Sequence, residues 1–332
     1  MIRACLGAVA GALGLLSPLA APAAPPEDAW IMPKAAGSLL VDIADAGGRW
    51  VAVGERGHVL ISDDARRWTQ VEAPTRVLLT AVSLDDTGLG LAVGHDSTII
   101  LSRDFGETWE RVHHDPGEPA PFLDVIIVSE RRAVAVGAYG RYAESRDGGQ
   151  SWDTRMLEPE AAASDDSGDG EEFYYDYHLN DIAIADEERW YIAAEAGNLY
   201  RSDDGGETWL RLPSPYEGSF LGILPLDRQR VLAFGLQGRL FRSGDAGASW
   251  SRIDTGTDAI LAAGRLLPDG RVLIGGYAGA VLGPFDPRSA VAATVLGNRP
   301  AVSDLRLLDN GALLTVGDAG VRRWPASVLS GN

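Results

Sequence analysis

Asp and Glu are the residues of this sequence with the greatest potential for catalysis or metal binding. Two carboxylates held at a fixed separation can act as acid and base in glycoside hydrolysis. Four candidates, Glu55, Asp96, Glu195 and Asp318, stand in turns after short apolar runs. The chain has 47 Asp and Glu against 29 Lys and Arg, however, so carboxylates are expected on every surface. A pair of them on one face does not by itself indicate catalysis.

An acidic insertion, residues 158–177, contains the one candidate metal site. Asp165, Ser167, Asp169 and Asp176 match positions 1, 3, 5 and 12 of a calcium-binding loop. Position 12 is Asp rather than the bidentate Glu, and no helical pattern flanks the loop. The same residues are also expected in a solvated acidic loop that binds no metal. We prefer this interpretation and keep calcium binding as the alternative. The second half of the insertion is a cluster of aromatic residues, which a solvated linker does not need: Phe173, Tyr174, Tyr175 and Tyr177.

The sequence contains few of the motifs that other classes of enzyme require. A sialidase needs an Arg-Ile/Leu-Pro motif near the N-terminus, whereas Arg211, Leu212 and Pro213 come late in the chain. Nucleotide-binding loops and nucleophile elbows are missing from the sequence. The only cysteine is Cys5, which lies in the N-terminal apolar segment. We therefore expect no catalytic residues, no cofactor and no disulfide.

Apart from Cys5, the residues discussed so far all belong to, or lie between, copies of a repeated sequence unit. It consists of a short apolar run, a Gly-x-x-Gly turn and a second run, and the copies are 40 to 43 residues apart except for one interval of 57. The first residues of the seven turns are Gly54, Gly94, Gly137, Ala194, Gly235, Gly276 and Gly317. Two β-runs and two turns in a period near 40 are typical of a four-stranded propeller blade. The sequence predicts an all-β, seven-bladed β-propeller.

Five of the copies continue into the motif Ser-x-Asp-x-Gly-x-Thr/Ser-Trp, known as the Asp-box. The first copy is one residue short and has Arg66 in place of glycine. Its carboxylate can accept backbone N–H groups across a turn, and its indole can pack between blades. A group repeated around a ring does not converge on one substrate, so we interpret the motif as structural. Its members are Asp64 and Trp68, Asp104 and Trp109, Asp147 and Trp152, Asp204 and Trp209, and Asp245 and Trp250.

The two ends of the propeller, residues 30–326, suggest how the ring closes. The last repeat has three apolar runs, 302–308, 312–316 and 321–324, and therefore lacks a fourth strand. Trp30 precedes Asp42 by twelve residues, as Trp68 precedes Thr80. We predict that residues 30–36 form a strand that completes the last blade, and that residues 327–332 are a tail.

Strand order predicts which loops share a face. The Gly-x-x-Gly turns and the connections between blades lie on one face, and the Asp-boxes lie on the other. Propellers commonly bind ligands on the first of these faces, around the channel. The acidic insertion projects there as well. The candidate partner-binding residues of the turns are Arg56, His95, Tyr139, Arg141, Glu195, Tyr277 and Asp318.

The N-terminus has the features of a secretory signal. Residues 1–23 combine Arg3, an apolar stretch and a small-residue cleavage site, and residues 24–29 form a linker. We expect a periplasmic or secreted monomer. The formal net charge of −18 disfavours nucleic acid and anionic membrane surfaces as partners and favours a basic protein partner or a cation.

With these repeats, this motif and this N-terminus, the sequence resembles the photosystem II stability/assembly factor family over residues 30–324. The resemblance implies a non-catalytic factor that holds an exposed segment of a membrane protein during assembly. Photosynthetic members have an arginine-rich surface patch, whereas the turn face here has only Arg56 and Arg141 nearby. A membrane protein complex other than photosystem II, or an exporter subunit, in a non-photosynthetic bacterium, fits these residues better. The alternative is a glycoside hydrolase that uses the carboxylates of the same face.

Overall fold

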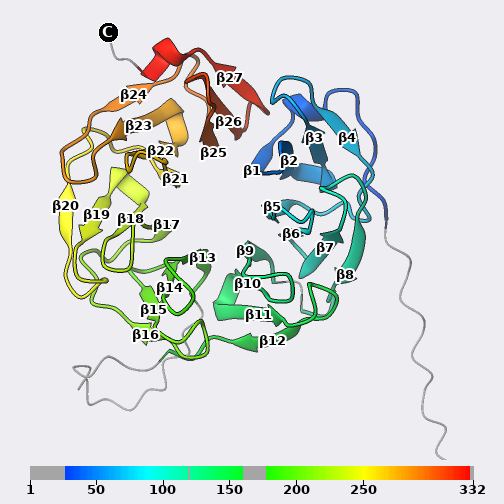
Figure 1. Ribbon diagram of the computed structural model, residues 1–332, viewed down its shortest axis with the longest axis horizontal. Coiled ribbons are helices and arrows are strands. Elements are labelled where there is room, and N and C mark those ends of the chain that lie inside the picture. Colours follow the sequence, from blue (N-terminus) through cyan, green and yellow to red (C-terminus); the bar gives the residue numbers. More distant parts are fainter. Residues whose placement is uncertain (1–26, 119, 160–176, 330–332) are drawn as a thin grey trace, which may run out of the picture.

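A ring of seven antiparallel sheets makes up the chain in this computed structural model, which describes residues 27–118, 120–159 and 177–329. In this part of the chain, six sheets have four strands and one has three. The sheets stand radially around a central channel (Figure 1). The prediction of a seven-bladed β-propeller is therefore confirmed.

Each blade is formed by consecutive strands. Blade 1 contains β1 (Leu40–Ala46), β2 (Arg49–Gly54), β3 (Val59–Ser62) and β4 (Thr69–Val71), and blade 2 contains β5 (Leu79–Leu84), β6 (Gly90–Gly94), β7 (Thr98–Ser102) and β8 (Glu110–His113). Blade 3 contains β9 (Phe122–Ile127), β10 (Ala133–Gly137), β11 (Arg141–Ser145) and β12 (Asp153–Met156), and blade 4 contains β13 (Leu179–Ile184), β14 (Trp190–Ala194), β15 (Leu199–Ser202) and β16 (Leu210–Arg211). Blade 5 contains β17 (Phe220–Pro225), β18 (Val231–Gly235), β19 (Leu240–Ser243) and β20 (Ser251–Ile253). Blade 6 contains β21 (Leu261–Leu266), β22 (Val272–Gly276), β23 (Ala280–Phe285) and β24 (Ala293–Val295), and blade 7 contains β25 (Val302–Leu307), β26 (Leu313–Gly317) and β27 (Arg322–Trp324).

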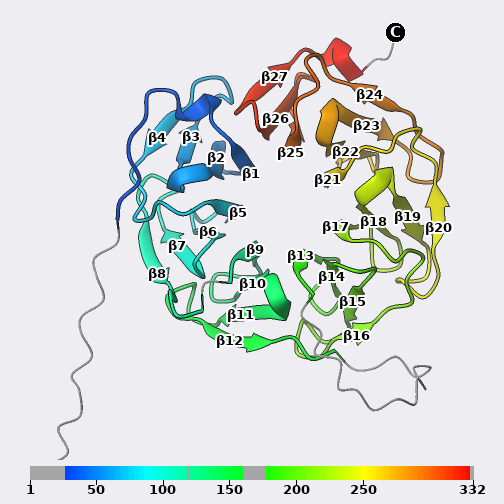
Figure 2. The same cartoon turned by 180° about the vertical axis from the view of Figure 1, so that it is seen from behind.

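The first strand of every blade lies at the channel, and the later strands follow outward (Figures 1 and 2). The second strand is the most completely buried element: all residues of β6, β10, β14, β18, β22 and β26 are buried. This burial explains their continuous apolar sequences, because neighbouring blades cover both faces of the strand. First strands expose some residues because they line the channel.

The hydrophobic core is divided among the interfaces between blades. Seven clusters of buried side chains each join two neighbouring blades. The cluster between blades 7 and 1 includes Leu40 and Ile43 of β1 together with Leu314 and Val316 of β26. Apolar packing therefore runs continuously around the ring.

In six of the seven turns the first residue is a glycine that lies very close to the backbone of its own blade, whereas blade 4 has Ala194 there. Gly94 has no left-handed backbone, but a Cβ there would lie 2.2 Å from the carbonyl oxygen of Leu78. Gly137 would meet Pro121 in the same way, at 2.3 Å. The third and fourth residues of the turn have positive φ, as at Tyr139 (57°) and Gly140 (71°). Glycine at the fourth position adopts this conformation without strain.

Gly94→Ala is expected to lower the free energy of unfolding by about 1–3 kcal/mol, because the backbone of β5 must move to admit the methyl group. Chemical denaturation followed by tryptophan fluorescence measures the change. Gly244→Ala is the matched control, since a Cβ at Gly244 has no atom within 4 Å. Equal stability of the two variants would contradict this account of the turn.

The seventh blade differs from the prediction. Residues 30–36 form no strand, and the described part of blade 7 has three strands only. The segment instead follows blade 1, where the N–H of Ala29 donates to the carbonyl of Ala73 and the N–H of Met32 to Oε1 of Gln70. Pro33 lacks an N–H group, which disfavours pairing within a sheet. The predicted closing strand is therefore wrong.

Both described ends of the chain pack on the ring. Ala29, in the predicted linker, is buried, and the short 3₁₀ helix η1 (Ala35–Gly37) leads into β1. At the other end, η6 (Ala326–Leu329) places Val328 and Leu329 against the core between blades 6 and 7. Residues 327–329 of the predicted tail are thus part of the fold. Within the described ranges, no helix is long and apolar enough to cross a membrane.

Candidate binding face and central channel

The Gly-x-x-Gly turns contact the connections between blades directly. The N–H of Gly57 donates to the carbonyl of Val77, at 2.7 Å, and that of Gly279 to the carbonyl of Pro300, also at 2.7 Å. On the opposite face, the N–H of Phe105, in a turn between third and fourth strands, donates to Gly88 in a turn between first and second strands. The two kinds of loop are therefore sorted onto the faces that strand order predicts. We call the first of these the turn face.

Two tyrosines stand out on the turn face. Tyr139, in the turn of blade 3, is 51% exposed, and Tyr277, in the turn of blade 6, is 44% exposed. Tyr277 also lines the central cavity. The two rings come from opposite sides of the channel, since blades 3 and 6 are separated by blades 4 and 5 (Figure 1).

The acidic insertion begins and ends beside Tyr139. The N–H of Leu157 donates to the carbonyl of Gly140, and the N–H of Gly140 donates to the carbonyl of Tyr177, both at 2.8 Å. His178, the next residue, packs edge-on against the ring of Tyr139 at 5.0 Å between centroids. Its Nδ1 lies 3.5 Å from Oε1 of Glu195. Tyr139 and Glu195 thus meet at the base of the insertion.

Two predicted partner-binding residues have structural partners instead. Arg141 is only 8% exposed, because its guanidinium donates to Oγ of Ser97 and to Oε2 of Glu118, the latter at 2.7 Å. It is not available on the turn face, and its assignment to a partner-binding surface is wrong. Asp318 accepts the N–H of Ala301 at 3.0 Å and so holds the connection into β25.

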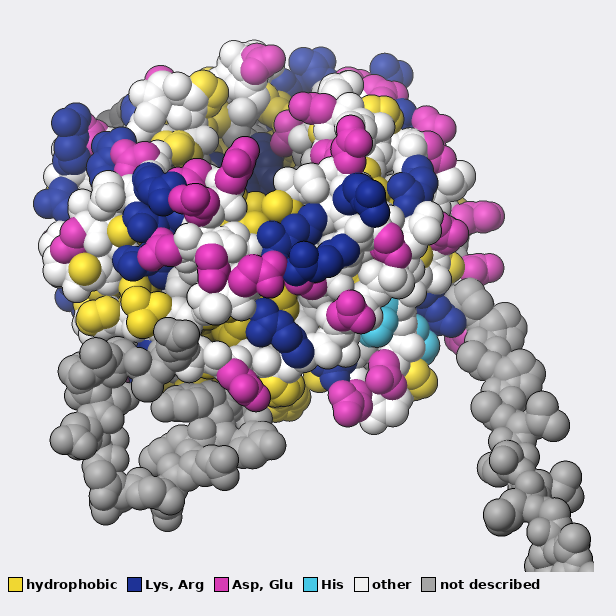
Figure 3. Space-filling model, turned by 60° about the horizontal axis from the view of Figure 1, so that its bottom comes forward, with side chains coloured by type: hydrophobic (Ala, Val, Ile, Leu, Met, Phe, Trp, Pro, Cys, Tyr) yellow, Lys and Arg dark blue, Asp and Glu magenta, His cyan; other side chains and the backbone are white. Residues whose placement is uncertain are grey.

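Arg56 and His95 are exposed on the turn face, as predicted. Arg56 takes the left-handed position of its turn, with φ of 57°. His95 lines a groove of about 800 Å³ together with His114, Arg76 and Arg111. Histidine side chains gather near the start of the described chain (Figure 3). Elsewhere on the outer side of the ring that this view shows, acidic and basic side chains are interspersed.

The central channel contains a set of carboxyl groups that the sequence analysis did not select. A cavity of about 420 Å³ is lined by Asp42, Asp124, Asp181 and Asp304, each the third residue of a first strand. The register of each of these strands shifts at this point, so a β-bulge turns the residue. The four aspartates come from blades 1, 3, 4 and 7.

Three of these carboxylates connect neighbouring blades. Oδ2 of Asp42 accepts the N–H of Val82 in blade 2, at 2.8 Å. Asp124 accepts the N–H of Ile182 in blade 4 at 2.8 Å, and Asp181 that of Ile223 in blade 5 at 2.6 Å. Each bond satisfies a main-chain donor in a first strand. These side chains therefore hold the innermost strands together around the channel.

The carboxyl groups also pair with one another. Asp42 is hydrogen-bonded to Asp304, and Asp124 to Asp181. Burial, followed by the charge of Asp304, raises the pKa of Asp42 to about 7. Burial and then the charge of Asp181 raise the pKa of Asp124 well above its ordinary range, and burial is the main cause that raises the pKa of Asp181. Two carboxyl groups that hydrogen-bond in a buried site are stable when one of them holds a proton.

Two arginines complete this cluster at the seam between blades 7 and 1. Oδ2 of Asp304 accepts Nη2 of Arg265 at 2.5 Å and Nη1 of Arg306 at 2.6 Å. Burial opposes the charge on Asp304, but these two guanidinium groups outweigh it and lower the pKa of Asp304. Arg306 also donates to the carbonyl of Ile43 and lies 3.3 Å from Asp45, both in blade 1. Side chains, rather than a shared strand, thus join the ends of the ring.

Comparisons with known proteins agree with this architecture. The family model described as Photosynthesis system II assembly factor YCF48 matches residues 118–271. The chloroplastic Photosystem II stability/assembly factor HCF136 of Arabidopsis thaliana is 33% identical over 109 residues, which are 32% of this chain and 24% of the plant protein. The chain is thus similar in sequence to photosystem II assembly factors over part of its length. Its match spans about a quarter of the length of this curated relative.

Solved structures share the fold of this chain at low sequence identity. The structure titled YCF48 bound to D1 peptide superposes with a TM-score of 0.68 at 14% identity, covering 92% of this chain and 98% of that one. YCF48 from Cyanidioschyzon merolae gives 0.66 at 14% identity, with 92% and 100% covered. The WD40 propeller domain of Doa1 gives 0.67 at 12% identity, with 90% and 95% covered. The fold of this chain is thus shared by assembly factors and by a WD40 domain.

The Asp-box turns of the propeller show the hydrogen bonds that the motif predicts. In blade 2, Asp104 accepts the N–H of Thr108 at 2.9 Å and its hydroxyl at 2.6 Å, while Gly106 has φ of 81°. The indole N–H of Trp109 donates to the carbonyl of Gly106, and the ring packs against the core of blade 1. The carboxylates of Asp147, Asp204 and Asp245 repeat this pattern. In the shortened copy, Asp64 accepts the N–H groups of Arg66 and Arg67.

The carboxylates of the central channel are not spaced like the catalytic pair of a glycoside hydrolase. Glycoside hydrolases separate their two carboxyl groups so that a sugar fits between them. In the channel, each pair is instead in direct hydrogen-bond contact, and Asp42, Asp124 and Asp181 also accept main-chain N–H groups. Asp318 holds a connection, as described above. These aspartates therefore have structural roles.

Several predicted residues lie outside the described ranges. They are the calcium candidates Asp165, Ser167, Asp169 and Asp176, and the aromatic residues Phe173, Tyr174 and Tyr175. Among the residues that the structure does describe, no group of three or more His, Cys, Asp or Glu side chains could hold a metal ion.

The aspartates of the channel could have been identified from a repeated position in the sequence. In four of the seven repeats, an aspartate stands third in the first apolar run, as in Leu40-Val41-Asp42-Ile43. A charged residue at the same place in several buried strands indicates a repeated structural partner. The partner itself, a main-chain N–H of the next blade, does not follow from one repeat alone.

Proposed function

We propose that this propeller is a non-catalytic accessory factor that binds an exposed segment of a membrane protein complex, or of an exporter subunit, in the periplasm. The observation that carries the proposal is the pair of exposed tyrosines on the turn face, Tyr139 and Tyr277, of which Tyr277 also lines the central cavity. Tyrosine supplies much of the binding energy in protein interfaces because it buries a large ring and keeps a polar hydroxyl group.

The position of the acidic insertion, residues 158–177, also supports the turn face as the binding surface. Both of its flanks are hydrogen-bonded to Gly140, next to Tyr139, so the extra chain leaves the ring at the proposed binding surface. Long loops on a rigid scaffold are commonly functional. Its acidic and aromatic sequence, together with the net charge of −18, favours a basic segment as the ligand.

The relatives support the class of function. One solved relative is titled YCF48 bound to D1 peptide, and the curated relative is named a stability/assembly factor. For the present chain, residues 1–23 support export to the periplasm, because they combine Arg3 with an apolar stretch and a small-residue cleavage site. We propose that it acts there as a monomer.

The test is affinity capture by the signal-cleaved protein from detergent-solubilised membranes of its own host. The partner found by mass spectrometry is then purified, and its affinity is measured for the wild type and for Tyr139→Ala/Tyr277→Ala. We expect the double variant to bind at least about tenfold more weakly. Deletion of residues 160–176 is expected to weaken binding as well.

The matched control is Ile184→Ala/Leu266→Ala. These two side chains end first strands, away from the turn face, and are 37% and 40% exposed, similar to the tyrosines. The control is expected to bind like the wild type. Equal binding by the tyrosine variant, or recovery of no membrane protein even at low salt, contradicts the proposal.

A further inference from the structure

The seventh blade leaves a place for one more strand. In blades 1 to 6, a fourth strand covers the third strand, and the residues of β3, β7, β11, β15, β19 and β23 are mostly buried. In blade 7, the third strand is β27, and its residues Arg322 and Arg323 are exposed while Trp324 is half-buried. The difference follows from the missing fourth strand. Among the residues that the structure describes, no strand takes the place beside β27 that a fourth strand occupies in the other blades.

The open edge offers main-chain hydrogen-bonding groups. The outward-facing N–H of Val321 donates to the carbonyl of Ala36, at 2.9 Å. Alternate residues of a strand direct their N–H and C=O to opposite sides, so those of Arg323 also face outward. Within residues 27–118, 120–159 and 177–329, β27 pairs with β26 and with no other strand. In blade 1, the residue at the position of Arg323 is Ile61, and it pairs with Thr69 of the fourth strand, β4.

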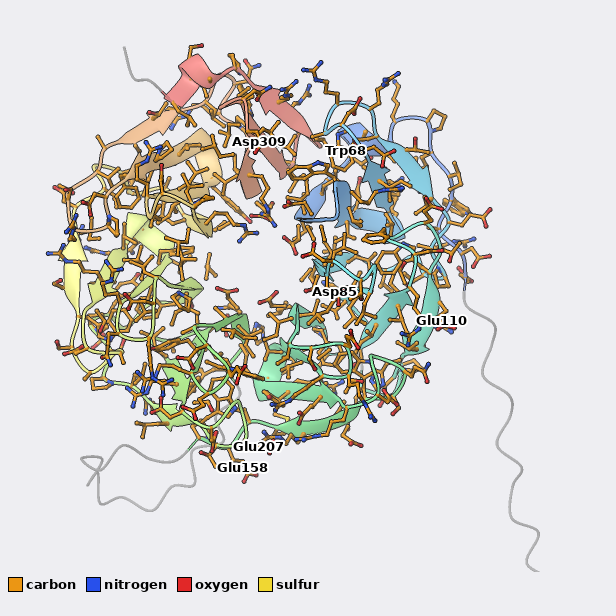
Figure 4. The ribbon with its side chains drawn as sticks, in the orientation of Figure 1. Trp68, Asp85, Glu110, Glu158, Glu207 and Asp309 are labelled. Carbon is orange, nitrogen blue, oxygen red and sulfur yellow. The ribbon has the colours of Figure 1, made fainter. Side chains whose placement is uncertain are left out.

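A recess adjoins this edge. A cavity of about 620 Å³ lies between the Asp-box turn of blade 1 and the loop that follows β25, and it includes Arg323. Asp309 lines this recess, and Trp68 lies across the seam between blades 7 and 1 (Figure 4). A chain that pairs with β27 would extend toward this recess.

The positive charges of Arg322 and Arg323 on the edge of β27 favour an acidic partner. Within the described residues, Arg322 and Arg323 have no ion-pair partner, although the protein carries a net charge of −18. Three of the four carboxylates that line the recess pair with arginines: Asp45 with Arg306, Asp63 with Arg49 and Asp64 with Arg67. The fourth, Asp309, lies across the recess on the loop that follows β25. A second copy pairing β27 with β27 would bring four arginines together, which is unfavourable. An acidic segment of a different protein meets no such repulsion.

We propose that β27 accepts an extended acidic segment of a partner protein as the fourth strand of blade 7. The main chain of Arg323 supplies the ladder hydrogen bonds, and the guanidinium groups of Arg322 and Arg323 select the charge. Strand addition of this kind takes its affinity from the main chain and its selectivity from alternate side chains. The site is separate from the turn face and does not depend on the function proposed there.

The experiment uses the signal-cleaved full chain and a fluorescent, end-capped octapeptide with the sequence Glu-Val-Glu-Thr-Glu-Val-Glu-Thr. Fluorescence anisotropy measures affinity, and hydrogen exchange followed by mass spectrometry measures protection of residues 321–324. Arg323→Pro removes the outward N–H, and Arg322→Glu/Arg323→Glu reverses the charge without removing it. Arg252→Glu is the matched control, because Arg252 is an exposed arginine on β20, the outer strand of blade 5.

We expect the wild type and Arg252→Glu to bind the peptide and to gain protection at residues 321–324. Both edge variants should bind at least about tenfold more weakly while keeping the wild-type melting temperature. A peptide with N-methyl groups on alternate residues should lose binding as well. The turn-face variant Tyr139→Ala/Tyr277→Ala should bind like the wild type, which separates this site from the one proposed above.

Three results would overturn the proposal. The first is equal affinity for the plain and the N-methylated peptide, which would show that only charge is recognised. The second is binding without protection of residues 321–324. The third is self-association of the protein, seen by sedimentation and lost on deletion of residues 160–176, because the occupant would then be the acidic insertion of a second copy.

Discussion

Replacing Asp304 by alanine is expected to lower the free energy of unfolding by about 3–5 kcal/mol, the usual cost of removing one partner from a buried ion pair. The carboxylate of Asp304 accepts hydrogen bonds from both Arg265 and Arg306, and it is hydrogen-bonded to Asp42. Without it, two guanidinium groups stay in the channel with no counter-charge at this distance. The effect is concentrated at the seam where blade 7 meets blade 1.

Denaturant unfolding measures this loss, and Asp304→Asn is a second variant that keeps the volume of the side chain. We expect the asparagine variant to be destabilised less than the alanine variant, since its amide oxygen can still accept one hydrogen bond. The control is Asp286→Ala, which removes an exposed ion pair with Arg288. The control should unfold at the same denaturant concentration as the wild type. If Asp304→Ala does so too, the seam is not held by these charges.

Stability is expected to fall as the pH rises from about 4 to about 7, by up to about 4 kcal/mol for Asp42 alone. In the unfolded chain, this carboxyl ionises at its ordinary pKa, near 4. In the folded protein, its pKa is about 7, so the folded state holds a proton that the unfolded state has lost. The stabilisation is therefore fully present below pH 4 and is lost as the pH passes through 7. The raised pKa values of Asp124 and Asp181 act in the same direction.

Other carboxylates limit stability at the acidic end. Backbone hydrogen bonds from Arg67 and Arg66 lower the pKa of Asp64 to about 2, and hydrogen bonds from Ser151 lower that of Asp147 to about 2. The stability that these groups contribute is present above pH 4 and lost below it. Greatest stability is therefore expected at about pH 4–5.

The measurement is the free energy of unfolding at intervals between pH 3 and pH 8. Asp42→Asn cannot ionise, so its profile between pH 4 and pH 7 should be flatter than that of the wild type, whatever its absolute stability. Groups that face Asp42 in the channel, namely Asp304, Arg265 and Arg306, are unchanged in this variant. Identical slopes for the variant and the wild type would show that Asp42 is ionised throughout.

The number of blades and the two faces could be predicted because each repeat carries local signals. The glycine turn and the Asp-box act over a few residues, as the contact between Gly94 and Leu78 and the turn around Asp104 show. A periodic local signal gives the order of the strands, and that order fixes which loops share a face. Tyr139 and Tyr277 were found in this way.

The closure of the ring could not be predicted, because it depends on contacts between the two ends of the chain. The twelve-residue spacing after Trp30 suggested a strand, but Pro33 and the hydrogen bond of Met32 to Gln70 direct the segment along blade 1. The bonds of Arg306 to blade 1 join residues more than 260 positions apart. Arg141 was misplaced for a related reason, since its partners Ser97 and Glu118 belong to another repeat.

A ring in which every blade is one continuous stretch of chain has interchangeable starting points. In a propeller whose last blade is assembled from both termini, moving the termini would cut that blade apart. Here a circularly permuted protein could begin at any connection between blades, with the natural ends joined across the seam, and each sheet would stay intact. Residues 158–177 already lengthen one of these connections without interrupting blade 3 or blade 4. The blade is therefore the natural unit for rearranging, adding to or engineering this protein.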